Sequence, residues 1–238
     1  MLTREGLSDS LRLVGHSARL VGGRRYWLAP LLTLLWPAVQ AFRLQIGWRE
    51  SVFEPSSVQT TLIGFPMMVL AIGLGVRIIA DEIDRRTLEI AYTVPGGAHR
   101  VWLAKLAAAI GLLVVSEALL ATVAFAFFSS IPLTALYGAL QESVFYLVLS
   151  MAFAVLTRSE ITGALLSAAT LCLNGLFSGF GDNQVRAFPT FNPLGLQHLS
   201  PEDIFAYTVQ NRIISMLLIA AITGLAFSRA ERREKLLG

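Results

Sequence analysis

Residues 81–105 read DEIDRRTLEIAYTVPGGAHRVWLAK and interrupt a strongly apolar chain. The stretch holds eight charged residues and one histidine, and a long apolar run lies on each side of it. Helical spacing puts four residues on one face, namely Ile83, Thr87, Ile90 and Val94. The charges lie on other faces, and Pro95-Gly96-Gly97 then ends the helix. The pattern predicts a short amphipathic helix at 82–95 between two membrane spans. An ordinary surface helix that shields the bundle is the alternative.

The composition indicates an integral membrane protein. Of the 238 residues, 55% are hydrophobic and only 15% are charged, and the mean hydropathy is +0.63. Soluble domains carry about 25% charged residues, and a soluble core of this size could not bury so much apolar surface. The net charge of +3 is small and comes from clustered arginines, so we expect no nucleic-acid partner.

Six segments approach the roughly 20 apolar residues that a membrane-spanning helix needs. They are 26–43, 58–80, 102–128, 133–157, 161–181 and 206–228. Pro30 and Pro37 predict kinks in the first of them. Because the first apolar run follows a long charged lead and has no clear cleavage site, we expect a retained span rather than a secretory signal. The whole chain, 1–238, is predicted to be a single all-helical membrane domain.

The basic residues predict the orientation. With the N-terminus inside, fifteen of the 19 Lys and Arg fall on the cytoplasmic side, and the outside holds only Arg43, Arg49, Arg186 and Arg212. Both termini are therefore expected in the cytoplasm. We expect the chain to lie in the cytoplasmic membrane of a cell, most simply the inner membrane of a prokaryote.

Two further segments are predicted to lie against the membrane. Residues 6–22 place apolar side chains on one helical face and predict an interfacial helix, with a solvated tail as the alternative. Residues 181–205 form the longest external segment, which contains Pro189, Pro193 and Pro201 among apolar residues. We expect this segment to re-enter the outer leaflet, with a compact external loop as the alternative.

The familiar catalytic and metal-binding motifs are missing from the sequence. No P-loop, His-Glu-x-x-His, Gly-x-Ser-x-Gly or Cys-x-x-Cys pattern is present. Cys172 is the single cysteine, and the three histidines have no metal-ligand spacing. We expect no enzyme activity, no metal and no cofactor on this chain.

Polar residues within the predicted spans are the candidates for a translocation path. They are Glu117, Gln141, Glu142, Asn211 and Arg212. An acid inside the membrane is costly and usually faces the bundle interior or a water-filled path. The two glutamates lie on neighbouring spans and could face one polar space, where they would contact a substrate or cation. A hydrogen-bonded acid that joins helices is the alternative.

The stretch at 81–105 also resembles a segment of the type-2 ABC transporter permeases. That family has an acid, then Thr-Leu-Glu, then a Pro, then a Lys ten residues after the Pro. Here these positions are Glu82, Thr87-Leu88-Glu89, Pro95 and Lys105. Arg86 and Gly97-Ala98 depart from the family's usual residues. The likeness extends to the interfacial helix, six spans, the external element with Asn192-Pro193, and the charged tail.

The resemblance implies an ATP-driven exporter. The cytoplasmic helix would dock on a separate P-loop ATPase subunit, which binds ATP and Mg²⁺, and the complex would hold two permease and two ATPase subunits. The second permease would be another copy or a paralogue. The residues expected to couple to the ATPase are Glu82, Ile83, Asp84, Arg85, Arg86, Thr87, Leu88, Glu89, Ile90, Val94 and Pro95.

Three other functions are compatible with the sequence. The permease of a haem or cofactor exporter would have a similar layout. An ion-coupled secondary transporter would use Glu117 and Glu142 as proton or cation sites, and a membrane scaffold or sensor would bind a non-ATPase partner through its cytoplasmic helix.

Overall fold

A computed structural model describes residues 15–23, 25–48, 53–84, 97–128, 130–178, 189–196 and 199–231. These residues form helices and connecting turns without a strand. The predicted helix 82–95 is described only as far as Asp84. Of the predicted interfacial helix 6–22, residues 15–22 are described and are helical.

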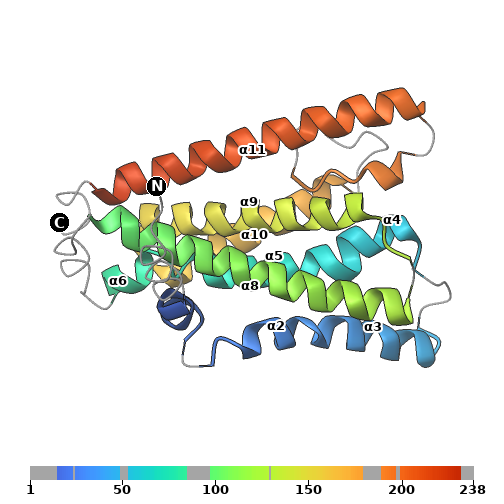
Figure 1. The fold of residues 1–238 in the computed structure, drawn as a ribbon, viewed down its shortest axis with the longest axis horizontal. Helices are drawn as coiled ribbons and strands as arrows, with labels where there is room; N and C mark the ends of the chain where they lie inside the picture. The colour runs from blue at the N-terminus through green and yellow to red at the C-terminus, as the bar shows by residue number, and fades with distance from the viewer. Residues whose placement is uncertain are drawn as a thin grey trace, which may run out of the picture.

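The long helices run along the long axis of the molecule (Figure 1). In chain order the helices are α2 (Leu28–Thr33) with α3 (Leu35–Gln45), α4 (Pro55–Ser57), the π-helix η1 (Val58–Gly64), α5 (Phe65–Gly75) with α6 (Ala80–Asp84), α8 (Ala98–Phe127), α9 (Leu133–Thr157), α10 (Glu160–Ser178), the short 3₁₀-helix η2 (Pro193–Gly195) and α11 (Pro201–Glu231). The α2–α3 pair, the run from α4 to α6, and helices α8, α9, α10 and α11 alternate in direction (Figure 1).

Among the described residues, four helices are long and apolar enough to cross a membrane. They are Val58–Ile83, Ala98–Phe127, Leu133–Thr157 and Pro201–Glu231. The predicted span 161–181 corresponds to α10, which is apolar over the shorter stretch Glu160–Leu176. The predicted span 26–43 is two short helices that meet at Leu34. The structure thus shows an all-helical membrane protein.

Pro37 explains the break between α2 and α3. A proline ring clashes with the carbonyl group four residues earlier, which here belongs to Thr33, the last residue of α2. Thr33 turns its hydroxyl back onto the carbonyl oxygen of Pro30, at 2.6 Å. The predicted kink is therefore a full interruption of the helix.

Helix α9 lies at the centre of the bundle and packs against α5, α10 and α11. Glycines allow two of these contacts to be close. A Cβ atom on Gly75 of α5 would collide with Ser150 Oγ and the Leu147 carbonyl oxygen, and one on Gly163 of α10 would lie 2.6 Å from Ala154 Cα. Gly224 of α11, by contrast, faces open space.

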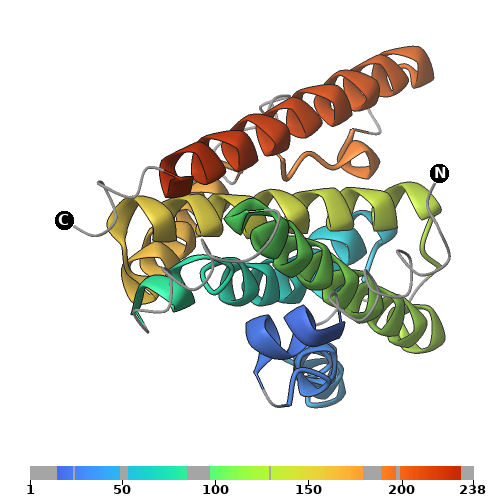
Figure 2. The ribbon, with the colours of Figure 1, turned by 60° about the vertical axis from the view of Figure 1, so that its left-hand side comes forward.

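The outer helices lie on opposite sides of this core, with α11 on one side and α2 and α3 on the other (Figures 1 and 2). In the most apolar 18-residue stretch of α11, only 17% is buried inside the protein, compared with 72% in the corresponding stretch of Val58–Ile83. The exposed side chains of α11 are large and apolar, for example Phe205, Leu217 and Leu225. Such a surface suits lipid or another membrane protein rather than water.

Residues 189–196, the described part of the predicted external segment, pack into the bundle instead of lying free. The Asn192 side chain donates a hydrogen bond to the Ser56 carbonyl oxygen at 2.6 Å, and Phe191 is 1% exposed. Thr190 is hydrogen-bonded to Asn174 of α10, which also donates to the Tyr146 hydroxyl of α9. Residues 201–205, predicted as part of the external segment, instead begin α11, with Pro201 as the first helical residue and Ser200 bonded to the Asp203 amide.

Candidate functional site

Two buried polar groups stand out in this bundle. One joins α6 to the start of α8, at the end of the bundle from which the predicted coupling helix leaves (Figure 1). The other lies between η1, α9 and α11, within the predicted membrane spans.

The first group is built around the Glu82 carboxylate. Lys105 Nζ donates to Glu82 Oε1 at 2.7 Å, and Trp102 Nε1 donates to Glu82 Oε2 at 3.0 Å. Lys105 Nζ also donates to the Ile78 carbonyl oxygen at 3.1 Å. Both oxygens of the acid are thus occupied by donors from α8. We call Glu82, Trp102 and Lys105 the α6–α8 lock.

Burial makes the α6–α8 lock a stiff connection. Lys105 is 2% exposed, Trp102 is fully buried and Glu82 is 9% exposed. Removing one partner of a buried ion pair typically costs about 3–5 kcal/mol, because it leaves the other charge uncompensated. The Trp102 ring also contacts Phe227 of α11, with ring centroids 5.8 Å apart. The α6–α8 lock thus connects α6 to α8, and the Trp102 ring connects α8 to α11.

The second group centres on a pair of hydrogen bonds between α9 and α11. Gln141 Nε2 donates to the Arg212 carbonyl oxygen at 2.9 Å, and Arg212 Nη1 donates to Gln141 Oε1 at 3.1 Å. Glu142 is 1% exposed and Gln59 of η1 is fully buried beside them. We call Gln59, Gln141, Glu142 and Arg212 the intramembrane polar cluster.

Several atoms of this cluster have no hydrogen-bond partner within the described part of the chain. They are Gln59 Nε2, Gln59 Oε1, Glu142 Oε2 and Arg212 Nη2. Leaving a buried polar group unpaired costs about 1–3 kcal/mol, and more for a charged one. Such groups in natural proteins are explained by a bound water or ion, by stored strain or by a functional role.

Glycines provide the space into which these side chains extend. A Cβ atom on Gly138 of α9 would lie 2.6 Å from Gln59 Nε2 and 2.8 Å from Arg212 Nη2. A Cβ atom on Gly64 would lie 3.5 Å from Glu142 Oε2. Any larger residue at Gly138 would displace both donors.

The π-helix η1 presents Gln59 to the cluster, and Pro66 accounts for its shape. Phe65 N–H bonds the carbonyl oxygen of Thr60, five residues earlier, as in a π-helix. Pro66 has no N–H for the next carbonyl group, that of Thr61. Trp36 Nε1 of α3 donates to that oxygen instead, at 2.7 Å. π-Helical turns are rare in proteins, and many of those that occur lie at functional sites.

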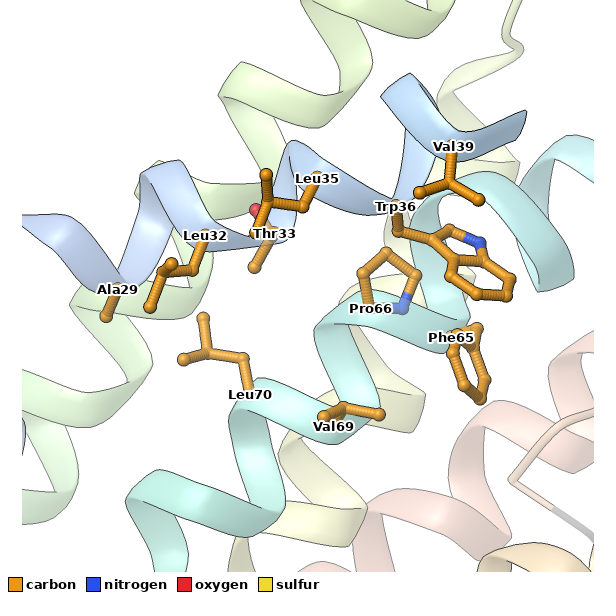
Figure 3. A pocket seen from close by; sticks show the side chains of 10 residues that line it. All are labelled: Ala29, Leu32, Thr33, Leu35, Trp36, Val39, Phe65, Pro66, Val69 and Leu70. Carbon is orange, nitrogen blue, oxygen red and sulfur yellow. The ribbon is translucent and has the colours of Figure 1, made fainter. Parts of the chain in front are cut away.

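Trp36 also borders an apolar groove of about 390 Å³ between α2, α3 and α5 (Figure 3). Its walls are mostly aliphatic and aromatic, and Thr33 adds the only hydroxyl group. No charged side chain lines the groove. It therefore suits acyl chains or apolar side chains rather than a charged substrate.

The predicted path residues are only partly brought together. Gln141, Glu142 and Arg212 meet in the cluster, and Asn211 is buried next to Arg212 on α11. Glu117 of α8 is 8% exposed, and no hydrogen bond or ion pair joins it to Glu142 in the described residues. The contacts of the described residues therefore do not support the expectation that the two glutamates share one polar space.

The predicted coupling residues lie mostly outside the described residues. Glu82 is in the α6–α8 lock, Ile83 packs partly buried against the core, and Asp84 ends α6. Arg85, Arg86, Thr87, Leu88, Glu89, Ile90, Val94 and Pro95 are not described.

Gln59 and Trp102 are the site residues that sequence reasoning missed. Gln59 carried a weak signal, because it is an amide at the start of an apolar run. Trp102 carried none, because a tryptophan near the end of a span is ordinary. No group of three or more His, Cys, Asp or Glu in the described residues could hold a metal ion.

Comparison of the chain with protein-family models, with curated proteins and with solved structures gives no match.

Proposed function

We propose that the chain is the membrane-spanning permease subunit of an ATP-driven exporter, with six spans and both termini in the cytoplasm. The α6–α8 lock is the observation that supports this proposal. The segment expected to contact an ATPase begins at Glu82, and the lock attaches that residue to a membrane-spanning helix. ATP-driven closure of the ATPase subunits would then reorient α8 and shift the population between inward- and outward-open states.

The direction of the helices supports the proposed number of spans. The α2–α3 pair and α10 run along the same axis as the four long helices and alternate with them in direction (Figure 1). Short or interrupted spans are tolerated where neighbouring helices satisfy the backbone.

Affinity purification in mild detergent tests the ATPase partner. We expect the tagged chain, purified from its native host, to retain a stoichiometric P-loop subunit. Glu89→Lys or Ile90→Asp should release that subunit while membrane insertion is unchanged. Glu54→Lys is the matched control, because Glu54 is exposed and directly precedes α4, which lies at the other end of the bundle from α6 (Figure 1). Normal ATPase binding by both helix variants would show that the coupling assignment is wrong.

An ion-coupled secondary transporter is the second candidate, because Glu142 lies inside a predicted span and its Oε2 atom has no hydrogen-bond partner within the described residues. Such a transporter would carry flux on an ion gradient alone, and Glu142→Gln would abolish that flux. Unchanged transport after removal of Glu117 would exclude that residue from either mechanism.

A further inference from the structure

The intramembrane polar cluster offers hydrogen-bond donors and acceptors at separate places. The free donors, Gln59 Nε2 and Arg212 Nη2, both lie over Gly138 of α9. The free carboxylate oxygen, Glu142 Oε2, lies toward Gly64. Gly138 and Glu142 are four residues apart on α9, which is about 6 Å along a helix.

Charge restricts what this arrangement can bind. An anion alone would leave Glu142 Oε2 without a partner, and a cation alone would leave Arg212 Nη2 without one. The two charges do not neutralise each other through direct contact, because no salt bridge of 4.0 Å or less joins them in the described residues. A ligand that carries both charges a few bonds apart satisfies both side chains at once.

Two exposed side chains cover the cluster between α9 and α11. The Tyr137 ring lies 5.5 Å from the Arg212 guanidinium carbon, and the Tyr137 hydroxyl is 4.0 Å from Met216 Sδ. Both of these covering side chains are exposed on the outside of the bundle, Tyr137 by 47% and Met216 by 58%. A ligand that enters from this side therefore has to displace Tyr137 and Met216.

We propose that the intramembrane polar cluster binds a zwitterionic group, with its phosphate or carboxylate held by Arg212 and Gln59 and its ammonium held by Glu142. Two sources carry this chemistry, namely a phosphatidylethanolamine headgroup and a small dissolved zwitterion. That the bound molecule is also the transported substrate rests on the proposed function. The binding itself does not.

Binding to the purified chain, without any ATPase, tests the proposal. The probes are phosphatidylethanolamine and dissolved O-phosphoethanolamine. Three probes lack one of the two charges: phosphatidylglycerol, inorganic phosphate and ethanolamine. We expect at least one zwitterion to bind about tenfold or more tightly than each of its single-charge counterparts. Binding of the lipid alone identifies a headgroup site, and binding of O-phosphoethanolamine identifies a site for solutes.

Variants test which residues hold the ligand. Glu142→Gln and Arg212→Gln should each weaken zwitterion binding about tenfold or more. Gly138→Ala keeps every charge but displaces the two donors, so it should weaken binding in a protein that still folds. Glu117→Gln is the matched control, because it removes a buried acid outside the cluster and should leave binding unchanged.

Equal binding of zwitterionic and single-charge probes would overturn the proposal, as would zwitterion binding that survives Glu142→Gln and Gly138→Ala. Because the ATPase is absent, these outcomes are independent of ATPase co-purification. Zwitterion binding without an ATPase partner would leave the site standing and remove the exporter proposal.

Discussion

At the scale of single residues, a buried ion pair carries the connection between α6 and α8. Glu82 and Lys105 have lost nearly all contact with solvent. Glu82 therefore depends on Lys105 and Trp102 for its hydrogen bonds, and Lys105 depends on Glu82 and the Ile78 carbonyl oxygen. Desolvation makes such a pair a poor source of net stability, whereas breaking it is costly. The pair is therefore better understood as a device that sets where α6 attaches.

Removing either charge should destabilise the protein. We expect Glu82→Gln or Lys105→Met to lower the free energy of unfolding by about 3–5 kcal/mol, because the remaining charge stays buried. The double variant should cost clearly less than the two single variants together. Thermal unfolding of the purified protein in detergent measures all three.

The control for this experiment is the exposed pair Arg77–Glu160, whose charged atoms are 4.0 Å apart. Arg77→Gln should change stability by no more than about 1 kcal/mol, because solvent screens the pair. A change at Lys105 as small as that at Arg77 would contradict the α6–α8 lock.

At the scale of elements, the π-helix η1 and helix α3 depend on each other. Pro66 leaves the Thr61 carbonyl group without a backbone donor, and Trp36 supplies one from α3. The Trp36 ring also packs on Phe65, with centroids 4.6 Å apart. The Thr61 carbonyl group therefore receives its hydrogen bond from Trp36, a residue of another helix twenty-five positions earlier in the chain.

A double-mutant cycle tests this dependence. Trp36→Phe keeps an aromatic ring but removes the donor, so it should cost about 1–3 kcal/mol of stability. In a Pro66→Ala background, the new backbone N–H at residue 66 lets the carbonyl groups of η1 pair within the helix. The cost of Trp36→Phe should then fall to about 1 kcal/mol or less. Unfolding in detergent measures the cycle, and an equal cost in both backgrounds would refute the account.

Helix crossings supply the next test at this scale. Gly75→Ala should destabilise the protein by about 1–3 kcal/mol, because the added methyl group meets Ser150 and the Leu147 carbonyl group of α9. Gly224→Ala is the matched control. It faces open space on α11, so it should be neutral or stabilising by up to about 1 kcal/mol. Similar thermal shifts for the two variants would show that α5 and α9 are not in close contact.

At the scale of the whole molecule, the described ion pairs lie toward one end of the bundle, whereas Glu117 and the polar cluster lie between the ends. The contacts Arg77–Glu160 and His99–Glu231 join segments at the end that holds α6 (Figure 1). The apolar flanks of α11 and of α2 and α3 face outward along the length between the two ends. This distribution is typical of a protein that crosses a bilayer along its long axis.

Cysteine labelling tests that orientation. Cys172→Ser provides a background without cysteine, because Cys172 is the single one in the chain. Arg100→Cys, at the start of α8, should react with a membrane-impermeant maleimide only from the cytoplasmic side. Leu133→Cys, which replaces an 82% exposed residue at the start of α9, should react only from outside. Labelling of both positions from one side would contradict the proposed topology.

The helical membrane class and the four long helices could be read from the sequence, because a run of about twenty apolar residues is a local property that suffices to predict a span. The contrast at 81–105 predicts a short helix between two spans, and of that helix only Glu82, Ile83 and Asp84 are described. Local patterns do not show which faces of two helices meet. Glu82 and Lys105 are 23 positions apart, and Gln141 and Arg212 are 71 apart. Only the packing of the helices decided these two pairings, because each needs two elements at one place. The same holds for the position of Gln59 beside Gly138, for the lack of a hydrogen bond between Glu117 and Glu142, and for the hydrogen bond from Trp36 to the π-helix.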